Sequence, residues 1–148
     1  MERADIPKIL IVDDDPEFLD IYKLCLGEHF EVHLAEGGEC AIRQLHKVKP
    51  AAILLDLRMP RVSGFAVLEH MQRQSALREL PVIVITSRRL DRKLREILDS
   101  QANVCHAFEK TVSPRRVAEE AKLMVEMGRL YSATRELISR GRGNGGSS

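Results

Sequence analysis

The feature that most constrains the fold is a regular alternation between short apolar runs and longer segments with helical periodicity. Each apolar run is largely aliphatic, which is typical of a strand that is buried on both faces of a parallel sheet. The five runs are Lys8–Asp13, Phe30–Leu34, Ala51–Asp56, Pro81–Thr86 and Val104–Phe108. The segments with apolar residues at helical spacing are 16–28, 38–48, 63–74, 90–98 and 113–140. Strands that alternate with helices form right-handed βαβ units, so we predict an α/β fold with a doubly wound, five-stranded parallel sheet and helices on both faces.

Local signals mark where several of these helices begin. Asp15 precedes Pro16, and a capping side chain followed by proline is a typical helix start. Ser63 opens the third helical segment as a cap, and Ser113-Pro114 opens the last one. We therefore assign Asp15 to a helix cap rather than to a binding site.

Composition excludes several classes of protein. The net charge of +1 argues against a protein that coats a polyanion, and an aromatic content of 4% without tryptophan argues against a base-stacking surface. The three cysteines, Cys25, Cys40 and Cys105, are far apart, which indicates reduced thiols in an intracellular protein rather than a disulfide framework or a zinc site. No apolar run has the length of a signal peptide core or a membrane span. We expect a cytoplasmic protein that binds neither membranes nor nucleic acid directly.

The last helical segment is longer than the sheet needs. A seam with spacings of four and three residues runs along it, formed by Leu123, Met127, Leu130, Thr134 and Leu137. This seam indicates either a homodimer through the last helix or a core helix with a frayed polar end. We divide the chain into a domain over 1–127, a helical extension over 128–140 and a flexible tail over 141–148. Residues 126–148 are too few for a second domain, so the chain either acts alone or continues into an output domain beyond this helix.

Polar residues follow the strands where their carboxyl ends meet. Asp13 and Asp14 follow the first strand, and Asp56 ends the third; Thr86-Ser87 stands at the end of the fourth, and Lys110 follows the fifth. Ligands of doubly wound sheets bind at this edge, and carboxylates gathered there repel one another unless a cation lies among them. Oxygen ligands without nearby histidine or cysteine favour Mg²⁺.

These residue types also suit phosphoryl transfer. Asp56 can act as the nucleophile, Thr86 can donate a hydrogen bond to a phosphoryl oxygen, and Lys110 can neutralise charge. We therefore predict a magnesium-dependent phosphoryl-transfer site at this edge.

The motifs resemble the receiver domain of two-component response regulators over about Lys8 to Val125. The resemblance lies in four segments: Ile9–Pro16 (ILIVDDDP), Asp56–Pro60 (DLRMP) with Gly64 after it, Pro81–Ser87 (PVIVITS) and Phe108–Lys110 (FEK). It implies a flavodoxin-like sheet with strand order 2-1-3-4-5.

The resemblance also implies roles for individual residues. Asp56 would be the phosphoacceptor, and Asp13, Asp14, Asp56 and the backbone carbonyl of Arg58 would hold Mg²⁺. Thr86, Ser87 and Lys110 would respond to the phosphorylated state. The phosphoryl donor would be a histidine kinase, a histidine phosphotransfer protein or a small acyl phosphate. Such a protein is a signalling switch rather than an enzyme, and its fourth helix, fifth strand and last helix would change on phosphorylation.

Three positions depart from the family pattern. Thr111 replaces a proline that usually follows the lysine through a cis peptide, so the Lys110–Thr111 bond is either strained or trans. Ala107 stands at the switch position, where an aromatic residue is usual. Asn103 replaces a glycine, which we expect to be a mild change because asparagine tolerates a left-handed backbone.

Basic residues lie near the site. Arg58 and Arg88 each follow a site residue by two positions, so they either remain solvated or shield the phosphoryl group from hydrolysis. The basic segment 87–99 is either a solvated face or part of a partner surface.

Two further interpretations stay open. Ala107 and Thr111 are compatible with a degenerate receiver that binds partners without being phosphorylated. A haloacid-dehalogenase-like phosphatase would use Asp13 as the nucleophile and Asp15 as acid and base, although Pro16 does not fit that motif.

Overall fold

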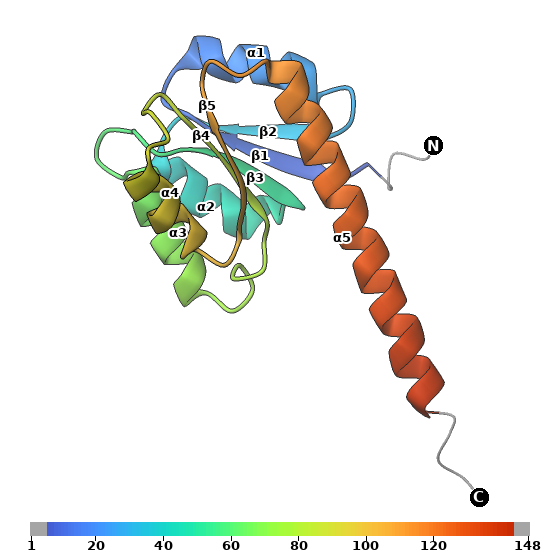
Figure 1. Ribbon diagram of the computed structural model, residues 1–148. Coiled ribbons are helices and arrows are strands. Elements are labelled where there is room, and N and C mark those ends of the chain that lie inside the picture. The colour runs from blue at the N-terminus through green and yellow to red at the C-terminus, as the bar shows by residue number, and fades with distance from the viewer. Residues whose placement is uncertain (1–5, 144–148) are drawn as a thin grey trace, which may run out of the picture.

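The sheet has the predicted parallel topology. The structure, a computed structural model, describes residues 6–143 and contains one five-stranded sheet in the order β2-β1-β3-β4-β5 (Figure 1). The strands are β1 (Lys8–Val12), β2 (Glu31–Ala35), β3 (Ala52–Asp56), β4 (Val82–Thr86) and β5 (Val104–Glu109). The helices are α1 (Pro16–Leu26), α2 (Gly38–Val48), α3 (Gly64–Arg73), α4 (Arg92–Asp99) and α5 (Pro114–Gly143). The strand order reverses beside β1, which places the carboxyl ends of β1 and β3 at the switch point.

The sheet is buried on both faces, as its aliphatic strands predict. Alternate residues of each strand point to opposite sides, so β1 contributes Leu10 to one core and Ile9 to the other. One core lies under α2, α3 and α4, and the second lies under α1 and α5 (Figure 1). β3 and β4 are buried along their whole length.

Side-chain caps begin three of the helices. The Asp15 carboxylate accepts a hydrogen bond from Glu17 N at 3.0 Å, and Ser63 Oγ accepts one from Ala66 N at 3.2 Å, as predicted. Asp91 caps α4 by accepting from Leu94 N at 2.9 Å. The helix therefore begins at Arg92, two residues after the predicted start, because Leu90 belongs to the preceding loop.

The start of β2 and the end of α5 also differ from the prediction. β2 begins at Glu31 because Phe30 closes the turn after α1, its N–H donating to the Leu26 carbonyl at 2.9 Å. α5 continues to Gly143, so the first three residues of the predicted tail are helical. Residues 144–148 of that tail lie outside the described part of the chain.

Asn103 does not adopt the left-handed conformation that asparagine tolerates. Among the described residues other than glycine, Lys49 and Arg61 have positive φ, and Asn103 does not. Its side chain is buried, where its amide must be paired. Oδ1 accepts from Gln72 Nε2 at 2.8 Å and Nδ2 donates to the Leu80 carbonyl at 3.4 Å. Asn103 thus joins the start of β5 to α3 through its side chain.

The last helix leaves the domain and projects beyond the sheet (Figure 1). Its first turns pack on α1 and the sheet through Val117, Ala118, Ala121 and Val125. Beyond Val125 the predicted seam is exposed to solvent: Met127, Leu130 and Leu137 are 60%, 68% and 69% exposed. Within residues 6–143, none of the helices combines the length and apolarity that crossing a bilayer requires.

Candidate functional site

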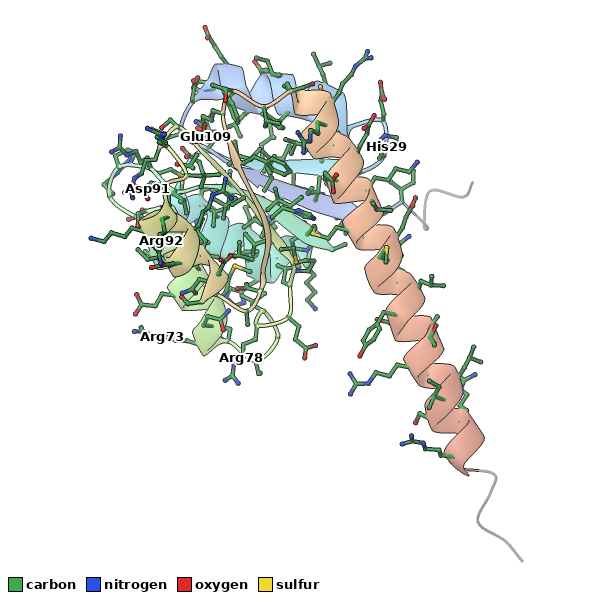
Figure 2. The ribbon with its side chains drawn as sticks, in the orientation of Figure 1. His29, Arg73, Arg78, Asp91, Arg92 and Glu109 are labelled. Carbon is green, nitrogen blue, oxygen red and sulfur yellow. The ribbon has the colours of Figure 1, made fainter. Side chains whose placement is uncertain are left out.

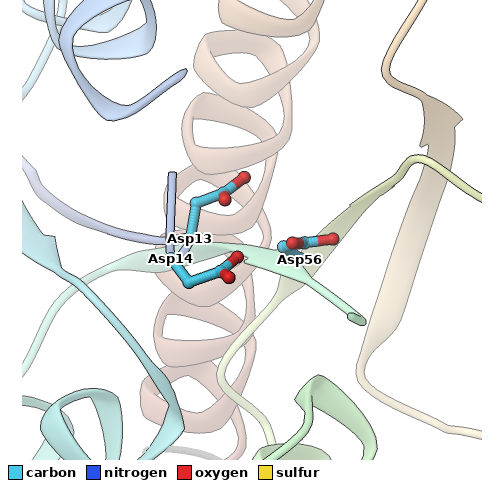
Figure 3. A group of neighbouring side chains, drawn as sticks. All are labelled: Asp13, Asp14 and Asp56. Carbon is cyan, nitrogen blue, oxygen red and sulfur yellow. The ribbon is translucent and has the colours of Figure 1, made fainter. Parts of the chain in front are cut away.

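Three carboxylates meet at the switch point of the sheet. Asp13 and Asp14 follow β1, Asp56 is the last residue of β3, and one carboxylate oxygen from each residue lies within 4.8 Å of the others (Figure 3). Asp13 and Asp56 are buried, with 1% and 4% of their surfaces exposed, whereas Asp14 is exposed. The sequence therefore identified an acidic cluster that the fold brings together.

Lys110 contacts two of these three carboxylates. Its Nζ lies 2.8 Å from Asp13 Oδ2 and 3.5 Å from Asp56 Oδ2. The Lys110 backbone N–H donates to the Thr86 carbonyl at 2.8 Å, which fixes the lysine beside β4. Nζ also lies 4.2 Å from the centre of the Phe18 ring on α1, a cation–π contact that the sequence interpretation missed.

Burial and crowding change the acidity of these groups. Burial, together with the nearby charge of Asp13, raises the pKa of Asp56 to about 6, although Lys110 and the Arg58 N–H partly oppose this rise. Burial also raises the pKa of Asp13 above its ordinary value against the opposing effect of Lys110. Burial disfavours the Lys110 ammonium, but its contacts with Asp13 and Asp56 outweigh this effect and raise its pKa. One ammonium thus only partly compensates two buried carboxylates.

This imbalance fits a hard divalent cation. Asp13 Oδ1 accepts from Asp15 N at 2.9 Å, whereas the buried Oδ2 has no hydrogen bond of good geometry, although Lys110 Nζ is close. Asp56 Oδ1 accepts from Arg58 N at 3.3 Å. A set of carboxylate oxygens with an unsatisfied buried member is the donor set that Mg²⁺ prefers.

Other predicted residues surround the cluster at different depths. Thr86 is fully buried at the end of β4, and its Oγ1 accepts from Arg88 N at 3.1 Å. Ser87, Arg58 and Arg88 are exposed. Because Arg88 is held to Thr86 through its backbone, its side chain starts next to the site.

The atypical positions are accommodated without a cis bond. No peptide bond within the described residues is cis, so Lys110–Thr111 is trans. Ala107 is partly buried and packs against the core under α4. Glu109, two residues further along β5, was not singled out from the sequence, although a charged residue on the inward-facing side of a strand is a recognisable signal.

The fold and the residues at the carboxyl ends of its strands define the chain as a doubly wound α/β domain with a carboxylate–lysine site at its topological switch point. The profile of the family described as the response regulator receiver domain matches residues 9–122, and the chain belongs to that family. Receiver domains are signalling domains of two-component systems, and the strand order 2-1-3-4-5 that the resemblance implied is confirmed.

Known relatives include regulators and kinases. The phosphate regulon transcriptional regulatory protein PhoB of Escherichia coli (strain K12) is 33% identical over 82 residues, which are 55% of this chain and 36% of that protein. The sensor histidine kinase TmoS of Ectopseudomonas mendocina is 28% identical over 100 residues, or 68% of this chain and 10% of that protein. A CheY-like response regulator receiver domain protein from Methanospirillum hungatei JF-1 has the same fold, with a TM-score of 0.75 and 23% identity over 86% of this chain and 99% of that one. The chain spans a minor part of these two longer relatives.

Proposed function

We propose that this protein is a phosphorylation-dependent switch in which Asp56 accepts a phosphoryl group from the phosphohistidine of a histidine kinase or phosphotransfer protein. An Asp56 oxygen attacks phosphorus, the new O–P bond forms as the P–N bond breaks, and the electron pair stays on the imidazole nitrogen, which takes up a proton. The observation that carries the proposal is the buried Asp56 carboxylate with Asp13 and Lys110 around it. We infer that this chemistry takes place in the cytoplasm, in keeping with three free cysteines, and that the output runs through protein contacts.

The surrounding residues have distinct roles in this proposal. Asp13, Asp14, Asp56 and the carbonyl of Arg58 would hold Mg²⁺, which supplies neutralising charge for the phosphoryl oxygens. Lys110 pairs with a phosphoryl oxygen in place of a carboxylate, while Thr86 donates its hydroxyl hydrogen to another. Ser87 directly follows Thr86 and is exposed. Movement of Lys110 and Thr86 would then alter the surface of α4, β5 and α5.

Acetyl phosphate with Mg²⁺ tests the acceptor directly. Intact mass measurement is expected to find one added phosphoryl group in the wild type and none in Asp56→Asn, because the amide is not a nucleophile. Asp20→Asn, an exposed change on α1, is the control and should be phosphorylated like the wild type. Omission of Mg²⁺ should slow the wild-type reaction at least about tenfold.

The other interpretations predict different results in the same experiment. Ala107 at the switch position favours a degenerate receiver, for which the wild type would acquire no phosphoryl group. Steady phosphate release that requires Asp13 but not Asp56 would instead indicate a phosphatase. Either result would overturn the proposed switch.

We further propose that Arg88 and Arg58 slow loss of the phosphoryl group. Both side chains are exposed beside the site, where a guanidinium can pair with phosphoryl oxygens and hinder attacking water. Arg88→Ala is expected to shorten the phosphorylated lifetime about threefold to tenfold, as followed by the decay of the intact-mass adduct. Arg92→Ala, on the exposed side of α4, is the matched control and should leave the lifetime unchanged. An unchanged lifetime in Arg88→Ala would contradict this role.

The exposed seam of α5 supports homodimerisation in a coiled coil. Leu123, Met127, Leu130 and Leu137 face away from the domain core and are 52–69% exposed, so a second copy would bury them. Sedimentation of the wild type is expected to reveal dimers at micromolar concentration, and Leu130→Glu should raise the dissociation constant at least about tenfold because it places a charge in the seam. Ser132→Glu lies on the other side of the helix and should dimerise like the wild type. A monomeric wild type would contradict dimerisation.

A further inference from the structure

The loop between β4 and α4, residues 87–91, is anchored at Leu90 from two sides. The Leu90 N–H donates to Glu109 Oε1 at 2.8 Å, and its carbonyl accepts from Arg95 Nε at 3.1 Å. The Leu90 side chain is 8% exposed and packs in the core under α4. Figure 2 shows Glu109 and Asp91 at the same end of the sheet, near the start of α4. The backbone of this loop therefore has a defined position that depends on a β5 side chain.

Glu109 joins this loop to the residue that contacts the site. It directly precedes Lys110, whose Nζ contacts Asp13 and Asp56. It is also the register partner of Thr86, the residue from which the loop departs. A shift of the Lys110 backbone that accompanies pairing of Nζ with a phosphoryl group would displace Glu109, and the carboxylate would carry that displacement to Leu90.

The same connection reaches the first turn of α4. Asp91 follows Leu90 directly and caps the helix through Leu94 N at 2.9 Å. Arg95, one turn into the helix, holds the Leu90 carbonyl. Movement of Leu90 would thus change both the cap and the first turn of α4.

Residue 107 is alanine, which makes the connection from Lys110 through Glu109 to α4 important in this chain. Ala107 lies two residues before Glu109, so both side chains project from the same side of β5, towards α4. A methyl group has no rotamers with which to transmit a change. A carboxylate that accepts a backbone N–H forms a strong, directional hydrogen bond.

We propose that Glu109 is a positioning residue that couples the state of Asp56 and Lys110 to α4 through its hydrogen bond with the Leu90 amide. This inference rests on the proposed phosphorylation of Asp56. The coupling depends on one hydrogen-bond acceptor, the Glu109 carboxylate. Glu109→Gln keeps a side-chain carbonyl at the same distance and therefore preserves much of the coupling. Glu109→Ala removes the acceptor and with it the coupling.

The first measurement is amide hydrogen exchange of the unphosphorylated protein, resolved at Leu90 by NMR. We expect Leu90 to exchange at least about tenfold faster in Glu109→Ala and within about threefold of the wild type in Glu109→Gln. Glu96→Gln, an exposed change on α4, is the control and should not alter Leu90 exchange. Unchanged exchange in Glu109→Ala would show that the hydrogen bond does not hold the loop and would overturn the proposal.

The second measurement follows the amide chemical shifts of residues 92–99 after addition of Mg²⁺ and acetyl phosphate, with intact mass recorded in parallel. The wild type and Glu109→Gln should respond similarly, whereas Glu109→Ala should take up the phosphoryl group but have less than about half of the wild-type shift change. A full α4 response in phosphorylated Glu109→Ala would overturn the coupling role alone. Failure of the wild type to become phosphorylated would overturn both this inference and the proposed function.

Discussion

Replacement of Gly64 by alanine is expected to lower the free energy of unfolding by about 3 kcal/mol, because a Cβ atom has no room at this position. Gly64 is the first residue of α3, and its N–H donates to the Leu57 carbonyl at 3.0 Å. An added Cβ would overlap the Asp56 carbonyl oxygen and lie 2.7 Å from Leu57 Cα. Because these are backbone atoms, relief requires α3 to move away from the end of β3.

The effect of Gly64→Ala should extend to the site. The backbone that must shift carries Asp56, so phosphorylation by acetyl phosphate is expected to slow together with the loss of stability measured by urea unfolding. Gly128→Ala is the matched control: apart from the neighbouring backbone of its own helix, no atom of the described residues lies within 4 Å of its added Cβ, and alanine favours the helix by up to about 1 kcal/mol. A Gly64→Ala protein within about 0.5 kcal/mol of the wild type would contradict the steric argument.

Asp56→Asn is expected to stabilise the protein at neutral pH without Mg²⁺ by roughly 2–3 kcal/mol. The ordinary pKa of 3.8 is raised to about 6 in the folded protein, so the folded state binds a proton more readily than the unfolded chain. The stability that this proton contributes is fully present below pH 3.8 and is lost as the pH rises through about 6. An amide resembles the protonated acid at every pH, so the variant avoids this loss.

Urea unfolding at pH 4, 5, 6 and 7.5 measures the effect as the difference in the free energy of unfolding between Asp56→Asn and the wild type. The difference should be small at the lowest pH and should grow through about pH 6. At pH 7.5, Mg²⁺ should reduce it by stabilising the wild type preferentially. Asp99→Asn, on the exposed end of α4, should change stability little at any of these pH values. A difference that does not vary with pH would contradict the raised pKa of Asp56.

Much of the fold was predictable because its signals are local. Short, continuous aliphatic runs identify the five strands, and caps such as Asp15 and Ser63 lie directly before the first residue of a helix. The position of the acidic cluster was also predictable, because the carboxyl ends of parallel strands must share one edge. That geometric rule is sufficient to predict that Asp13 and Asp56 lie close together.

Contacts between side chains that are far apart in the sequence were less predictable from the sequence. Nothing local to Asn103 indicates Gln72 and Leu80 as its partners, so the buried hydrogen bonds of its side-chain amide could not be predicted from the sequence. In the same way, the Phe18 ring beneath Lys110 depends on how α1 lies over the sheet.

The sequence by itself therefore determined the order of strands and helices, the edge that carries Asp56, and the absence of an aromatic residue at 107. Only the tertiary structure decided that Lys110 Nζ lies closer to Asp13 than to Asp56 in this state, and that Glu109 binds the Leu90 amide 19 residues away. The physical reason is the range of the interactions. Periodicity and capping act between residues a few positions apart, whereas hydrogen bonds and ion pairs across a sheet depend on register and side-chain direction, which are set only when all the elements pack together.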